Sequence, residues 1–142
     1  MATRSRIGIE NEDGTVSSVY CHWDGYPSHN GDLLINHYSD REKVEELIAL
    51  GSISSLRKNI APAPGSDHSF EKPQEDVTIV YHRDRGEDLD EGRIDASLEE
   101  FEKEDNEEYG YVLSKANVWL VTGYGEALKS VEDILNGVEK DV

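Results

Sequence analysis

The chain has 142 residues, a length that suits one domain with one hydrophobic core. It carries 31 acidic and 14 basic residues, for a formal net charge of −17. This charge disfavours direct binding to nucleic acid or to an anionic membrane surface, because both attract Lys and Arg side chains. It favours a basic partner, a multivalent cation or solubility alone.

Cysteine usage and hydropathy indicate the compartment. The single cysteine, Cys21, excludes an intramolecular disulfide and suits a reducing environment. The N-terminal residues have no apolar signal-peptide core, and no stretch approaches the length of a membrane span. We therefore expect a cytoplasmic protein.

The first half of the chain predicts a hairpin followed by two helices. Residues 6–10 and 16–23 alternate in polarity around an Asp13-Gly14 turn, the pattern of a β-hairpin. Residues 29–38 predict a short helix. The string Ser39-Asp40-Arg41-Glu42 has the form of a capping box and predicts a second helix that ends at Gly51.

The middle of the chain is less regular. Residues 52–75 predict a long irregular connection on the surface, since Pro and Gly residues interrupt any periodic pattern. The β-rich residues 77–82 predict a third strand. An acidic tract, residues 84–108, follows, and within it we expect a loop at 86–92 and a short helix beginning near Ser97.

The last third predicts a second hairpin, formed by residues 109–113 and 117–121, and a helix from Leu128 to the C-terminus. The element order is therefore ββααβαββα. We predict a single α+β domain over residues 1–142, with one mainly antiparallel sheet of about five strands and helices packed on one face.

Chemistry-bearing residues gather where the second predicted strand ends, in the string from Cys21 to Pro27. Cys21 and His22 are adjacent on a strand and point to opposite faces, so they do not form an activated thiolate–imidazole pair. His22 and Asp24 share a face and suit an imidazole–carboxylate pair. The alternative is structural, with Cys21 and Trp23 in the core and a rigid turn after them.

A second group follows the third predicted strand, from Tyr81 to Glu87. Arg83 and Arg85 suit a phosphate or carboxylate ligand, although nearby acidic side chains offer local ion pairs instead. If the two strand ends meet, we expect one ligand site that contains His22, Asp24, Tyr26, His82, Arg83 and Arg85.

Cofactor and metal signatures are missing from the sequence. The five histidines lack the spacing of a zinc-binding helix, and the acidic tract lacks the ligand pattern of an EF-hand loop. The chain also has no phosphate-binding glycine-rich loop and no serine nucleophile elbow. We therefore expect no metal and no cofactor, and binding rather than catalysis.

Negative charge is concentrated in the second half of the chain. Residues 83–108 contain 13 acids and 4 bases. Rows of carboxylates can occupy a basic nucleic-acid-binding cleft in another protein, whereas the simpler interpretation is a solvated face. The residues that we expect to contact a partner are Trp23, Glu87, Asp88, Asp90, Glu91, Glu99, Glu100 and Glu102.

The string from Tyr20 to Pro27, which contains His-Trp-Asp-Gly-Tyr-Pro, resembles a family of small uncharacterised bacteriophage and prophage proteins. The residues at 4–10, 47–56 and 81–87 resemble that family too. The resemblance covers most of the first 90 residues and the final hairpin. It implies a phage or mobile-element source and a location in the host bacterial cytoplasm, but no established activity, fold or site.

Our first hypothesis is an acidic accessory protein that binds and modulates a basic host protein, such as a defence or nucleic-acid-processing factor. The second is a protein that binds or sequesters a small, nucleotide-like ligand, or an unusual enzyme, with its site near His22 and His82. The third is a structural or virion-associated component. A pocket that joins the two strand ends would favour the second hypothesis over the first.

Overall fold

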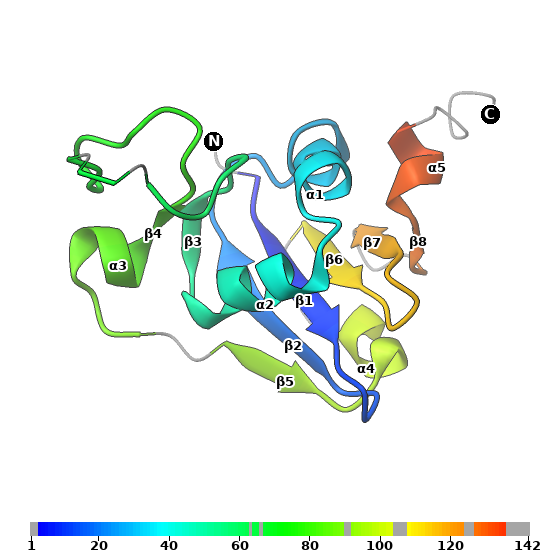
Figure 1. The fold of residues 1–142 in the computed structure, drawn as a ribbon. Coiled ribbons are helices and arrows are strands. Elements are labelled where there is room, and N and C mark those ends of the chain that lie inside the picture. The colour runs from blue at the N-terminus through cyan, green and yellow to red at the C-terminus, as the bar shows by residue number, and fades with distance from the viewer. Residues whose placement is uncertain are drawn as a thin grey trace.

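The computed structural model describes residues 3–62, 64–65, 67–89, 92–103, 108–123 and 127–135. Within these ranges the chain forms an α+β fold with an eight-stranded sheet and five α-helices (Figure 1). The strands are β1 Ser5–Glu10, β2 Val16–Cys21, β3 Ile53–Ser55, β4 Ile79–Val80, β5 Arg93–Asp95, β6 Tyr109–Leu113, β7 Trp119–Gly123 and β8 Lys129–Ser130. The helices are α1 Asp32–His37, α2 Arg41–Ala49, α3 Tyr81–Arg85, α4 Leu98–Lys103 and α5 Val131–Leu135.

Both predicted hairpins are present, although the second strand ends at Cys21 rather than at 23, and the last predicted one spans Trp119–Gly123 rather than 117–121. β1 pairs antiparallel with β2, and β6 pairs antiparallel with β7. The two hairpins join through β1 and β6, which run parallel with Ile7 opposite Tyr111. β2 and β3 are also parallel, so the sheet is mixed, while the other described pairs are antiparallel. The predicted mainly antiparallel sheet of about five strands is therefore matched in part, because the sheet has eight strands and two parallel pairs.

The additional strands are short and lie outside the two hairpins. The sheet order is β4-β3-β2-β1-β6-β7-β8, and β5 pairs with β2 near its start. β3, β4, β5 and β8 have two or three residues each, too few to show alternation in a sequence. The third predicted strand, residues 77–82, is therefore partly wrong, because only Ile79–Val80 is extended and Tyr81 begins α3.

Helices cover both faces of the sheet. On one face, Ile7, Val19 and Tyr111 pack beneath α1, α2 and α5 in the larger core. On the other face, Phe101 of α4 packs with Val16 and Val112. The prediction that all helices lie on one face is wrong, because odd and even positions of the central strands both carry apolar residues.

The first predicted helix, residues 29–38, is divided. Pro27–Gly31 forms a π-helical turn that leads into α1. The second helix begins one residue later than the capping-box pattern indicates, because the Asp40 side chain accepts the Glu42 backbone N–H, 3.0 Å away. Gly51 follows the helix with a φ of 83°, as a helix-terminating glycine does.

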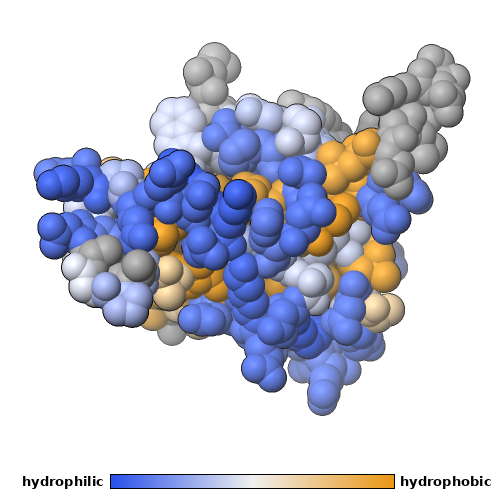
Figure 2. Space-filling view, turned by 45° about the horizontal axis from the view of Figure 1, so that its top comes forward, coloured by the Kyte–Doolittle hydropathy of each residue, from blue (hydrophilic) through white to orange (hydrophobic). Residues whose placement is uncertain are grey.

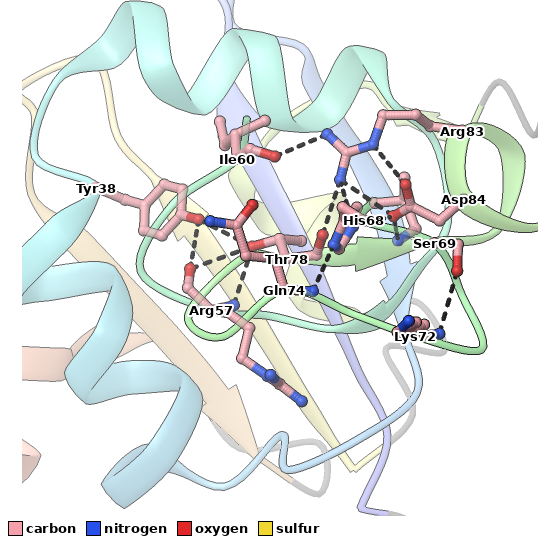
Figure 3. Close-up of polar contacts among 11 residues, drawn as sticks. Tyr38, Arg57, Ile60, His68, Ser69, Lys72, Gln74, Thr78, Arg83 and Asp84 are labelled. Atoms are coloured by element: carbon pink, nitrogen blue, oxygen red, sulfur yellow. Dashed lines mark hydrogen bonds and ion pairs between the residues drawn. The ribbon is translucent and has the colours of Figure 1, made fainter. Parts of the chain in front are cut away.

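A network of buried polar groups ties the long connection to the core (Figure 3). The Tyr38 hydroxyl donates to the Arg57 carbonyl oxygen at 2.6 Å, and the Thr78 hydroxyl also donates to that oxygen at 3.1 Å. Leu56, Ile60 and Val77 are buried. The connection is therefore irregular but packed, whereas the sequence predicts a surface segment.

The outer surface is mostly polar. Figure 2 shows hydrophilic residues over much of one face, with apolar residues in narrower patches between them. Among the helices in the described ranges, none combines the length and the apolar character that a membrane crossing needs.

Candidate functional site

The two strand ends singled out in the sequence lie side by side. Cys21, the last residue of β2, is opposite Ile53 of β3, and Ile53 is also opposite Val80, the last residue of β4. Beyond this row, the Tyr81 backbone N–H donates to the Ser52 carbonyl oxygen at 3.2 Å. The segments 20–26 and 81–87 therefore approach each other around the beginning of β3.

A cavity of about 310 Å³ lies between them, and we call it the strand-end pocket. Along one edge of β2, residues 16–18 pair with β5 and Cys21 pairs with β3. Tyr20 lies between these two paired stretches, and it lines the pocket. The lining residues are Tyr20 and Ser52, then Tyr81, His82 and Arg85 of α3, and Glu87 and Asp88 after it.

Arg85 is held by aromatic rings and a carboxylate. Its guanidinium lies 4.5 Å from the centre of the Phe70 ring and 4.8 Å from that of Tyr81. It also forms an ion pair with Glu87, and about half of each side chain is exposed. The positive charge of Arg85 is therefore already compensated within the chain.

Arg83 points away from the strand-end pocket into the connection (Figure 3). Its guanidinium donates to the Ile60 carbonyl oxygen at 2.7 Å, to the Thr78 carbonyl oxygen at 2.8 Å and to Asp84 at 2.8 Å. Arg83 and Arg85 consequently do not converge on one anion.

Asp84 and His68 form a buried pair beside Arg83, with 3% and 2% of their side chains exposed. The His68 Nδ1 accepts the Gln74 backbone N–H at 2.9 Å, so Nε2–H faces Asp84 at 3.2 Å. Burial raises the pKa of Asp84, but hydrogen bonds from Arg83, from the Val80 N–H and from His68 outweigh it, and the pKa is lowered. Sequence reasoning missed His68, because its partners lie far along the chain.

The other predicted ligand residues divide into two groups. The Tyr20 hydroxyl lies 2.7 Å from Nδ1 of His22, which places His22 behind the pocket wall. Asp24 and Tyr26 form a separate cluster, where the Tyr26 hydroxyl donates to Asp24 at 3.2 Å. The imidazole nearest Asp24 is His29, at 3.9 Å, rather than the expected His22.

The residues beside His22 differ in burial. Cys21 is fully buried, and burial raises the pKa of its thiol to about 11. A neutral thiol of this kind is not a nucleophile near neutral pH. Trp23 is 43% exposed, so the alternative that placed it in the core is wrong, and its ring meets the His22 ring edge-on at 4.7 Å.

Of the predicted partner residues that are described, Trp23 follows β2, and the acidic ones follow α3. Glu87, Asp88, Glu99 and Glu100 are exposed, and two of them form ion pairs within the chain, Glu87 with Arg85 and Glu99 with Lys103. Glu102 has a structural contact, since its carboxylate accepts the Leu128 backbone N–H at 2.9 Å. Asp90 and Glu91 lie outside the described residues.

Neither a metal-binding cluster nor a known relative indicates what this site binds. Among the described residues, no group of three or more His, Cys, Asp or Glu side chains is placed to hold a metal ion. Protein-family models, curated proteins and solved structures show no match to this chain. Function is therefore inferred from the geometry and charge of the surface itself.

Proposed function

We propose that this chain is a non-enzymatic binding protein that recognises a basic surface of a partner protein through exposed carboxylates. This proposal rests on a difference between the cationic and the anionic side chains around α3: the cations have partners within the described part of the chain, and one carboxylate does not. Arg83 and Arg85 are engaged by Asp84 and Glu87, whereas Asp88 makes no hydrogen bond or ion pair with the described part of the chain. The surface thus offers anionic groups to a partner, and its net charge of −17 adds long-range attraction.

A small anionic ligand is the second candidate, because a pocket does lie between the two strand ends. Its charge argues against this candidate. A phosphate would need to displace Glu87 from Arg85, and the neighbouring Asp88 would repel it. A cationic group is instead attracted by Asp88 and by the net charge of −17, so the basic partner is favoured.

The resemblance of the string from His22 to Pro27 to bacteriophage and prophage proteins supports a partner in the host bacterium. Proteins that process nucleic acid carry basic clefts, since they contact phosphates with Lys and Arg. We therefore propose a host defence or nucleic-acid-processing factor as the partner, in the bacterial cytoplasm. Binding would block or compete for its basic cleft.

The test is affinity capture from bacterial lysate with two triple variants of equal charge. One removes three exposed carboxylates of the acidic tract, a set that we call the acidic surface, by Asp88→Asn after α3 and by Glu99→Gln and Glu100→Gln on α4. The matched control, Glu45→Gln, Glu132→Gln and Asp133→Asn, neutralises exposed acids of α2 and α5. We expect a basic protein to be retained by the wild type and the control but lost from the acidic-surface variant and in high salt. Retention by all three proteins in high salt would contradict the proposal.

A further inference from the structure

We propose that the strand-end pocket binds the guanidinium group of one arginine side chain of the partner. This inference rests on the proposed function and assigns a single anchor residue to it. Both Tyr20 and Tyr81 line the pocket, which offers aromatic surface, and Glu87 and Asp88 also line it. A planar cation satisfies aromatic rings and carboxylates at the same time.

Among the charged and imidazole groups that line the pocket, Arg85 is engaged by Glu87, and acceptors remain at His82 and Asp88. His82 Nδ1 lies 2.7 Å from the Glu87 carbonyl oxygen, which only accepts, so Nδ1 carries the proton. In the neutral ring, Nε2 is then an acceptor. Asp88 supplies a further acceptor that has no partner in the described ranges. A guanidinium has five N–H donors and no acceptor, and it matches this set.

Arg85 shows that this part of the molecule already holds a guanidinium. Phe70, Tyr81 and the Glu87 carboxylate surround it, with two aromatic rings within 4.8 Å of its central carbon. The strand-end pocket shares Tyr81 and Glu87 with this contact and adds Tyr20 and Asp88, whereas Phe70 does not line it. A second guanidinium beside Arg85 would therefore depend mainly on the added groups, Tyr20 and Asp88.

Size favours a side chain over a larger ligand. A volume of about 310 Å³ is at the lower limit of pockets that enclose drug-sized molecules, and it accommodates one long side chain. Lysine carries the same charge, but its ammonium group is compact and cannot stack flat on a ring. We therefore expect the pocket to prefer arginine.

The probe is a short, capped Gly/Ser peptide with one central arginine, titrated into the full-length protein and followed by NMR. Matched peptides carry lysine, or citrulline as the neutral isostere of arginine. We expect shifts at Tyr20, Ser52 and Tyr81, binding about tenfold weaker for citrulline, and intermediate binding for lysine. Asp88→Asn should weaken arginine binding by about threefold, whereas Asp133→Asn on α5, at the opposite end of the sheet, should not.

Three outcomes would overturn the inference: equal binding of arginine and citrulline, equal loss in both variants, or stronger shifts at these residues with inorganic phosphate. The test separates this inference from the proposed function. If a basic protein is captured in a salt-dependent manner but the arginine peptide does not perturb the pocket, only the inference fails. If the peptide binds as expected and no basic protein is captured, only the proposed function fails.

Discussion

Asp84 and Asp88 lie four residues apart in the acidic tract, yet their surroundings are opposite. Asp84 is 3% exposed and accepts hydrogen bonds from the Val80 N–H and the Arg83 guanidinium. Asp88 is exposed and makes no ion pair with the described residues. One carboxylate therefore stabilises the fold, while the other remains available for binding.

We predict that Asp84→Asn lowers the free energy of unfolding by about 3 kcal/mol at pH 7, because it removes the negative charge beside Arg83 and replaces one of two accepting oxygens with an NH2 group. Urea denaturation measures the change. Asp88→Asn is the control and should lie within about 0.5 kcal/mol of the wild type.

A comparison of the wild type with Asp84→Asn over a range of pH tests the lowered pKa of Asp84. A carboxyl with a folded-state pKa below its unfolded value contributes its full stability above the unfolded pKa and loses it as the pH falls through the folded one. The difference between wild type and Asp84→Asn should thus be constant above about pH 5 and shrink below about pH 4. A difference that does not vary over this range would contradict the assignment.

At the scale of elements, β5 brings the acidic tract back to the sheet after α3. Gly92, just before β5, has a φ of 79°, and a Cβ atom there would lie 2.4 Å from the Ser18 carbonyl oxygen. Gly86, at the end of α3, has a similar φ of 75° but no atom within 4 Å of its Cβ position. An alanine at Gly86 would therefore meet backbone strain alone, whereas an alanine at Gly92 would meet a steric clash as well.

We predict that Gly86→Ala costs about 1 kcal/mol, from strain alone, and that Gly92→Ala costs about 2 kcal/mol more. Gly92→Ala should also speed amide hydrogen exchange in β5, because the clash separates β5 from β2. Equal stability of the two variants would show that β5 does not pack as closely as described.

Local patterns predicted some elements well and others poorly. The hairpins β1–β2 and β6–β7 follow from alternation around tight turns, which the sequence shows directly. The parallel pairing of β1 with β6 joins residues about a hundred positions apart, and no local pattern indicates it. The β-rich residues 77–82 suggested a longer strand, but a local contact favours a helix from Tyr81, since the Asp84 carboxylate accepts the Val80 N–H four residues before it.

At the scale of the whole molecule, the candidate site was predicted in part. His82 and Arg85 line the strand-end pocket, and His22 contacts it through Tyr20. Arg83 turned inward because of acceptors at Ile60 and Thr78 that only the folded connection brings together. Tertiary contacts between distant residues, rather than the residues' own chemistry, decide which side chains share a site.

If exposed carboxylates bind a basic partner, the affinity depends on salt, because dissolved ions screen the attraction between opposite charges. Calorimetric titration of the captured partner should show the affinity falling by about tenfold between about 0.05 and 0.5 M salt. The variant with Asp88→Asn, Glu99→Gln and Glu100→Gln should bind more weakly and show a smaller salt dependence. An affinity that stays constant over this range, or is equal for the variant and the wild type, would contradict the account.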